Sequence, residues 1–490
     1  TPQIDPSLPG DIADQFQRPA VGALAAPCLS EPTIGAVYPR NFSPPLFEWT
    51  AAAQANVFEL RLRIGNQAHE LVIYTPDNRY QMPIDLWQRL STHSAGQAIT
   101  ISLRAAVLTT GKLSAGPAAA PGGDVTLSRV EASGAVLYWT TSNGSALKGF
   151  RVGDPQSQVV IDPPRLADGT KCVGCHVSAP DGLLSFFSRS ADANGDLPFS
   201  IDARGVDGTA SAAPAARMSD VARGLLQRNN QTLPVLSRAH YSESDAVVVS
   251  MLNHASTNDR WELVFTDLRA QTPESATGVI ARTGDGRQPA NPAFSQDGRT
   301  LAYVSTDGRV TDGRVRDGVA DIYTVPWNDR KGGAATPLAG AADPLFNEYY
   351  PSYSPGDRLL AFNRVAAGVR MYHAPTAEVF VVPAQGGRAV RVAANDPPVC
   401  TGQPSPGVTN SWPRWAPVVG DDQGKSVFWL VFSSTRRSSY PQLYMAAVVA
   451  YKDQVRGEVI ETYPAVYVTS QNPLESNHTP AWDDFKIILQ

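Results

Sequence analysis

The residues with the most specific chemistry are two cysteines and a histidine in one short segment, Lys171-Cys172-Val173-Gly174-Cys175-His176. This C-x-x-C-H spacing is the attachment signature of c-type haem, in which both thiols form thioethers and the histidine binds iron. A structural zinc site needs four ligands, and the sequence offers no second C-x-x-C or H-x3-5-H pair. A dithiol redox pair would lie at a strand-to-helix junction, whereas residues 177–182 predict a turn. The motif therefore favours one covalent haem c over zinc or a dithiol.

Composition limits the classes of protein and partner. The 490 residues are 42% hydrophobic and 18% charged, enough for two or three cores in an ordinary globular chain. A net charge of -5 provides no basic surface for nucleic acid or an anionic membrane. No apolar run approaches the roughly 20 residues of a membrane-spanning helix. Abundant glycine and proline, 39 and 40 residues, are typical of many short strands joined by turns.

The first 152 residues contain no chemical motif. Residues 1–34 are proline-rich and predict an extended arm. Residues 35–152 carry short segments of alternating polarity, such as 57–64 and 98–103, which predict a β-sandwich. This region loosely resembles fibronectin type III and immunoglobulin-like modules, which space or orient their neighbours.

The second half contains a repeat. P-A-F-S-Q-D-G-R-T-L-A-Y begins at Pro292, P-S-Y-S-P-G-D-R-L-L-A-F begins at Pro351, and weaker copies begin at Pro413 and Pro480. Strand, turn and strand at a period near fifty residues is the pattern of a propeller blade. The repeat resembles that of TolB-type β-propellers, with a P-x-[FYW]-S-x-D-G-x-x-[LI]-[AV]-[FY] unit. The resemblance implies an all-β chain whose residues 153–490 form a propeller, usually of six blades. The last fragment, residues 481–485, is expected to supply one closing strand.

The haem motif runs directly into this repeat. Cys175-His176 aligns with Pro292-Ala293, and the same register places His240 one blade later. Equivalent positions on neighbouring blades lie on one rim of the channel, so we expect His176 as the proximal and His240 as the distal iron ligand. An ordinary rim residue is the alternative for His240, and His478 and Met218 are the competing distal ligands. Strand-like flanks replace the helices of a cytochrome c domain, so that resemblance extends only to Cys172, Cys175 and His176.

Two further sets of residues suggest a bridge and a cation site. Haem attachment resembles the export-side maturation of bacterial cytochromes c, which implies a removed signal peptide and a periplasmic or extracellular location. In such an oxidising compartment Cys28 and Cys400 would form a disulfide, with two separate buried thiols as the alternative. Asp307, Asp312, Asp317 and Asp321 fall in one turn-rich loop that would suit calcium, although interleaved arginines also fit a solvated loop.

Three functions compete at this point. The first is electron transfer by a monohaem c-type cytochrome with a redox partner protein or a multi-subunit complex. The second is a haem enzyme or a gas or redox sensor, which needs an open iron position. The third is a protein-interaction scaffold with a structural haem. No G-x-S-x-G elbow, H-E-x-x-H pair or P-loop occurs, so no catalytic residue is assigned and the electron carrier is favoured over a stand-alone enzyme.

Overall fold

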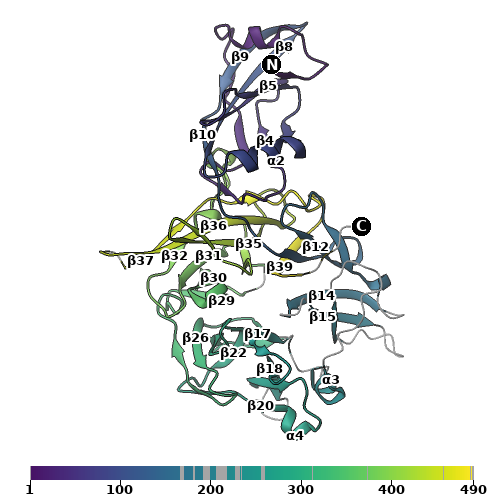
Figure 1. The fold of residues 1–490 in the computed structure, drawn as a ribbon, viewed down its shortest axis with the longest axis vertical. Helices are drawn as coiled ribbons and strands as arrows, with labels where there is room; N and C mark the ends of the chain where they lie inside the picture. The colour runs from purple at the N-terminus through teal and green to yellow at the C-terminus, as the bar shows by residue number, and fades with distance from the viewer. Residues whose placement is uncertain are drawn as a thin grey trace.

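The fold is that of a computed structural model, which describes residues 2–165, 170–179, 183–190, 199–205, 218–226, 232, 234–254, 260–311, 313–371, 373–455, 457–485 and 487. Within these ranges the side chains of residues 143, 165, 170, 175, 183–190, 199–205 and 254 are not described. Figure 1 shows an N-terminal domain above a ring of β-sheets.

The N-terminal domain contains two sheets and two helices. The larger sheet has the order β1 (Gln3–Ile4), β6 (Leu71–Thr75), β5 (Val57–Ile64), β8 (Ala98–Thr109), β10 (Gly123–Leu127) and β3 (Val37–Tyr38), with β9 (Lys112–Ala119) on β8. The smaller sheet has the order β2 (Cys28–Glu31), β4 (Leu46–Thr50) and β7 (Arg79–Gln81). The helices are α1 (Ile12–Phe16) and α2 (Ile84–His93). The β-sandwich prediction for this region stays a prediction.

The first 34 residues are more structured than an extended arm. They contain β1, α1 and β2, and β1 adds in parallel to the edge of the large sheet. Ile12 and Phe16 lie one helical turn apart and are fully buried beside Val57 and Tyr74. This spacing places both side chains on one face of a short helix, and burying that face anchors the segment.

The rest of the chain forms a β-propeller, a ring of antiparallel sheets (Figure 1). One sheet has the order β13 (Gln158–Ile161), β12 (Ala146–Arg151), β11 (Ala135–Thr140) and β39 (Asn477–Asp483), and the next has β14 (Thr170–Ser178), β15 (Leu183–Ser190) and β16 (Phe199–Gly205). Two more are β17 (Val235–Tyr241), β18 (Ala246–His254), β19 (Arg260–Asp267) and β20 (Thr277–Val279), and β22 (Gln288–Phe294), β23 (Thr300–Thr306), β26 (Ala320–Pro326) and β28 (Thr336–Pro337). Two others are β29 (Phe346–Tyr353), β30 (Leu359–Ala366), β31 (Glu378–Pro383) and β32 (Val390–Arg391), and β33 (Ser411–Trp415), β35 (Lys425–Ser434), β36 (Gln442–Asp453) and β37 (Gly457–Thr462), with β34 (Gly420–Asp422) on β35 and β38 (Val466–Tyr467) on β36.

Short elements join these sheets. Two small pairs are β21 (Ala281–Thr283) with β27 (Gly332–Ala334) and β24 (Val310–Thr311) with β25 (Arg314–Val315). The helices are α3 (Asp220–Leu226) and α4 (Pro273–Ala276), with single 3₁₀ turns at Ser142–Gly144, Pro163–Arg165, Pro355–Asp357, Ala393–Asn395 and Val399–Thr401. Among the residues described, no helix has the length and apolar character needed to cross a membrane.

The C-terminal strand closes the ring. β39 pairs antiparallel with β11, with Val136 opposite Trp482 and Trp139 opposite His478. The sequence placed residues 135–151 in the N-terminal domain, whereas the structure builds them into this closing sheet. Their alternating pattern shows a strand but not its partner, which comes from the far end of the chain.

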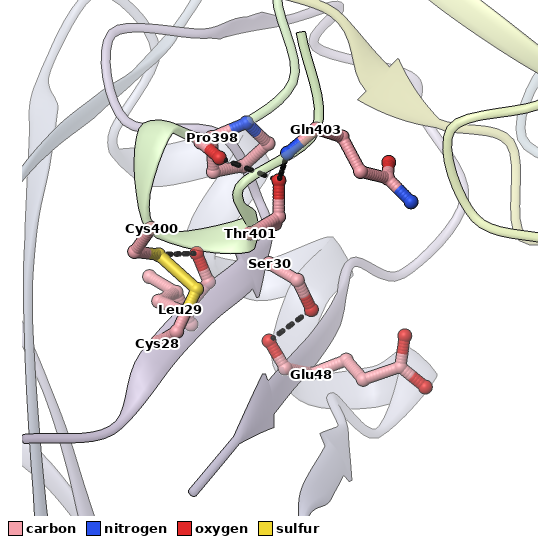
Figure 2. Close-up of a disulfide and its surroundings, with 8 residues drawn as sticks. All are labelled: Cys28, Leu29, Ser30, Glu48, Pro398, Cys400, Thr401 and Gln403. Atoms are coloured by element: carbon pink, nitrogen blue, oxygen red, sulfur yellow. Dashed lines mark hydrogen bonds between the residues drawn. A yellow bond between two sulfur atoms is a disulfide. The ribbon is translucent and has the colours of Figure 1, made fainter. Parts of the chain in front are cut away.

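The N-terminal domain is fixed to the ring by packing and by a disulfide. Side chains of the small sheet share one buried cluster with Trp429 and Leu443 of β35 and β36. Cys28 of β2 is bonded to Cys400 in the 3₁₀ turn Val399–Thr401, with their Cα atoms 5.5 Å apart (Figure 2). The bridge therefore joins segments separated by 372 positions in the chain.

Candidate functional site

The C-x-x-C-H segment lies in β14, the first strand of its sheet. Val173 pairs with Ser188 and His176 with Phe186, so β14 holds one residue more than β15 between these pairs. This is a β-bulge, which bends the strand and redirects side chains.

A bulge of the same size recurs in four other strands that line the channel, although Gly174 of β14 does not share their positive φ. Asn291, Tyr350, Trp412 and Thr479 all have positive φ, between 42° and 56°, and each comes directly before a repeat proline. Each of these strands gains one residue over its neighbour at this point. The bulges therefore define a common register around the ring.

In this register the repeat position of His176 is the first paired residue after the bulge. Its equivalents are Ala293, Ser352, Arg414 and Ala481. The pairing agrees with the sequence alignment of His176 with Ala293, and it places Cys175 where β22, β29, β33 and β39 carry proline.

Cys172 is held beside a serine from the neighbouring sheet. Its Sγ lies 3.4 Å from Ser145 Oγ. The Ser145 hydroxyl donates to the Val173 carbonyl at 2.7 Å and accepts from the Val173 amide at 3.1 Å, so it fixes the backbone of the motif. Cys172 is partly exposed and is a free thiol. The side chain of Cys175 lies outside the described residues.

The imidazole of His176 has two buried nitrogens, and neither makes a hydrogen bond of normal geometry. Burial lowers the pKa of His176 to about 4, with a small opposing effect from the backbone of Leu137 and a further lowering by the Arg414 charge. The side chain is therefore neutral at pH 7, which is the form that binds a metal ion.

His478 lies in the same buried region. Its ring centroid is 4.7 Å from that of Trp139, 5.5 Å from Trp412 and 5.6 Å from His373. Burial lowers its pKa to about 3, and the nearby His373 and His176 act in the same direction. Its Nδ1 is buried and makes no hydrogen bond. Ring closure by β39 thus brings a second unpartnered imidazole nitrogen toward the motif.

His240 lies in an irregular stretch of β17, where the first paired residue after the register shift is Tyr241, it is not among the residues that line the axial cavity, and its nitrogens are engaged. Nδ1 lies 2.6 Å from Asp245 Oδ2, and Nε2 lies 2.9 Å from the Gly298 carbonyl. Its ring also packs against the contacting pair Phe294 and Trp327, with centroids 5.4 and 5.2 Å away. Iron ligation by His240 would require one of these hydrogen bonds to break.

Met218 lies elsewhere, against α3. It packs on a small buried cluster that includes Ala222, Leu226 and Val248.

A cavity of about 180 Å³ lies where the first strands of the blades converge, and we call it the axial cavity. It is lined by residues of β14, β17, β22, β29, β33 and β39, among them His176, Arg414 and Tyr353. This volume is below the roughly 300–1,000 Å³ of ordinary cofactor pockets, so the axial cavity does not enclose a porphyrin.

The carboxylates of the predicted calcium loop are bonded to protein groups. Asp307 accepts from the Val319 amide at 2.7 Å, Asp317 pairs with Arg309 at 2.7 Å, and Asp321 pairs with Arg287 at 2.8 Å. Asp312 lies outside the described residues. In the part of the chain that is described, no group of three or more histidine, cysteine or acidic side chains is arranged around a metal position. Calcium binding stays a prediction.

Sequence reasoning missed several residues of this site. Ser145, Trp139 and Trp412 carry no motif, and Arg414 was seen only as part of a weak repeat copy. Arg414 had one detectable signal, because it is the charged residue that follows the repeat proline at Pro413.

Comparisons with known proteins give distant likenesses. The sequence matches no protein-family profile and no curated protein. A nidogen/laminin complex chain is 11% identical, with a TM-score of 0.35, over 69% of this chain and 99% of its own. An α-L-arabinanase from Penicillium chrysogenum is 12% identical, with a TM-score of 0.36, over 64% and 86%. A prolyl endopeptidase is 14% identical, with a TM-score of 0.32, over 78% of this chain, which spans only 48% of that enzyme. The ring is established by the strand pairing of this chain.

Proposed function

We propose that this chain is an exported monohaem c-type cytochrome that transfers electrons, with haem c bound through Cys172, Cys175 and His176. One observation carries the proposal. The histidine of a C-x-x-C-H motif has both nitrogens buried and neither makes a hydrogen bond of normal geometry, although burying unpaired polar atoms is costly. A metal bond would satisfy one of these nitrogens, and the backbone of Leu137 lies near the ring as a partner for the other.

The described residues fit such a group in their donor chemistry. Cys172 offers a partly exposed free thiol, and Ser145 holds the adjacent backbone of the strand in place. His176 is neutral at pH 7 because burial lowers its pKa to about 4, so it needs to lose no proton before ligation. When bound, haem c supplies one-electron exchange, and its potential depends on the axial ligands and burial.

For the distal ligand we favour His478 over His240. His478 has a buried nitrogen with no hydrogen bond and lies close enough to His176 to lower its own pKa, whereas both nitrogens of His240 are bonded. Met218 is occupied in packing against α3. A bis-histidine iron would have no open position, which suits electron transfer to a redox partner protein or complex.

The finer features of the fold belong to the same proposal. The recurrent bulge and proline support a TolB-type propeller, and the sheets of the ring among the described residues support a count of six blades. The Cys28–Cys400 disulfide supports a periplasmic or extracellular location, because such bonds persist in oxidising compartments.

The test is the mass and the spectrum of the protein produced in bacteria that attach haem c. We expect a mass increase of one haem and a low-spin spectrum in both oxidation states. His478→Ala should give high-spin features while the haem remains attached, and His240→Ala should leave the spectrum unchanged. A chain with the bare polypeptide mass refutes the proposal, and a spectrum altered only by His240→Ala reverses the ligand assignment.

One observation favours the second candidate, a haem enzyme or sensor. The axial cavity beside His176 has room for a small molecule. A five-coordinate spectrum that shifts with carbon monoxide or nitric oxide would select this function over electron transfer.

A further inference from the structure

The axial cavity contains a cation with no matching anion. Of the equivalent positions identified around the ring, Ala293, Ser352 and Ala481 are small, and only His176 and Arg414 carry an ionisable group. All five residues line the axial cavity. The shared repeat position therefore places Arg414 and His176 beside the same axial cavity.

The guanidinium of Arg414 makes one hydrogen bond, from Nη1 to the Pro413 carbonyl at 2.9 Å. No carboxylate in the described ranges forms an ion pair with it. Burial lowers its pKa to about 10, so the group remains charged at neutral pH. A guanidinium has five N–H donors in a planar fork, and most of them remain available here.

The carboxylates near the axial cavity are already paired with a cation or hydrogen-bonded to backbone amides. Asp483 is held by Arg238, and Asp357 accepts the backbone amides of Gln296 and Asp297 at 2.8 Å. Asp297 in turn accepts the Arg299 amide at 2.9 Å. These groups do not neutralise Arg414.

A second donor faces the same space. Tyr353 lines the axial cavity, and its hydroxyl is buried with no hydrogen-bond partner. Burial raises its pKa and the nearby charges of Asp357 and Asp297 act in the same direction, so the hydroxyl stays protonated and can donate. A buried cation and a buried hydroxyl, both with unused donors, are the complement of a small anion with several oxygen acceptors.

We infer that the axial cavity binds a small oxyanion, of carboxylate or phosphate type, through Arg414 with Tyr353 as a second donor. Its volume of about 180 Å³ equals roughly six water molecules at about 30 Å³ each, which suits an anion of a few heavy atoms. The site does not depend on the haem proposal, because neither donor belongs to the C-x-x-C-H motif. The same chemistry has a second source, a propionate of the haem itself, which the experiment separates.

The test is calorimetric titration of the full chain with inorganic phosphate at constant ionic strength. We expect saturable binding by the wild type, at least about tenfold weaker binding by Arg414→Gln, and a smaller loss in Tyr353→Phe. Arg238→Gln/Asp483→Asn is the matched control, because it removes a paired cation and its carboxylate from the same cavity together, and it should bind within about twofold of wild type.

Two further experiments cover an Arg414 variant that does not fold and the source of the anion. If Arg414→Gln does not fold, Arg414→Lys keeps the charge but loses the fork, and it should fold and bind several-fold more weakly. Equal binding by the wild type and a folded Arg414 variant, or no binding by the wild type, overturns the site. Titrating haem-loaded protein and the haem-free Cys172→Ser/Cys175→Ser variant separates the sources: binding to both supports a free oxyanion, whereas binding to the haem-free chain alone overturns it in favour of a propionate. A colourless wild type that still binds phosphate refutes the haem proposal only.

Discussion

Removing the Cys28–Cys400 disulfide should destabilise the junction between the N-terminal domain and the ring. The bridge closes a loop spanning 372 positions, for which the chain-entropy relation gives about 6 kcal/mol at 25 °C. Measured values are smaller, typically about 2–4 kcal/mol, because unfolded chains retain structure. We therefore expect the Cys28→Ser/Cys400→Ser variant to lose about 2–4 kcal/mol of unfolding free energy.

The assay is urea unfolding followed by tryptophan fluorescence. Trp49 of β4 and Trp429 of β35 are 1% exposed and belong to the shared core of the two parts, so this junction contributes to a signal that the chain's nine tryptophans share. A thiol reductant should lower the midpoint of the wild type to that of the variant, and it should leave the variant itself unaffected. An oxidised wild type that unfolds at the same urea concentration as the variant would refute the reasoning.

Three further predictions concern buried charge, a turn and ring closure. Burial raises the pKa of Glu348 from 4.5 to about 7, so between these pH values the folded state holds a proton that the unfolded state has lost. The free energy of unfolding should therefore fall as pH rises from about 4.5 to 7. Glu348→Gln should remove up to about 3 kcal/mol of that fall, measured by urea titrations at pH 5 and 7.5. Gly298→Ala, at φ +71°, places a Cβ 2.6 Å from a histidine nitrogen and should lower the free energy of unfolding by about 1–3 kcal/mol. Gly356→Ala, at φ +72°, has no atom within 4 Å of the new Cβ and should lower it less. Thermal unfolding of the two variants makes the comparison. Deleting residues 477–490 removes the closing strand β39 and should make the ring sensitive to limited proteolysis.

The local repeat was the part of the fold that the sequence predicted well. The proline, aromatic and Asp-Gly signals of a strand-turn-strand unit occur within about twelve residues, so they survive in a single sequence. They located the first strands and aligned His176 with Ala293, as the strand pairing also does. The closing role of the C-terminal fragment followed from its being too short for a blade.

The contacts around the site could not be predicted in the same way. His478 meets Trp139 only because β39 pairs with β11, more than 300 residues earlier, and no local pattern encodes that partner. For His240 the alignment gave a rim position, but β17 has a larger register shift than the other strands, and the first paired residue after it is Tyr241. Asp245, five residues after His240, and the Gly298 carbonyl of the next sheet take up the histidine nitrogens, and such hydrogen bonds depend on tertiary placement.

The repeat also explains how a haem motif can lie in a blade without refolding it. The first strand of each sheet is an edge strand, where proline is tolerated because no ladder hydrogen bond is lost. Cys175 occupies that proline position in β14, so the substitution removes no pairing that the other blades possess. Placing the repeat residue there, as Cys175→Pro, should keep the stability within about 1 kcal/mol of wild type, because Gly174 can adopt the positive φ that precedes the other repeat prolines. The same variant should abolish normal two-thioether attachment, seen as haem loss or a changed spectrum. A large destabilisation by Cys175→Pro would show that β14 does not follow the register of the other blades, and the placement of His176 beside Arg414 would then lose its basis.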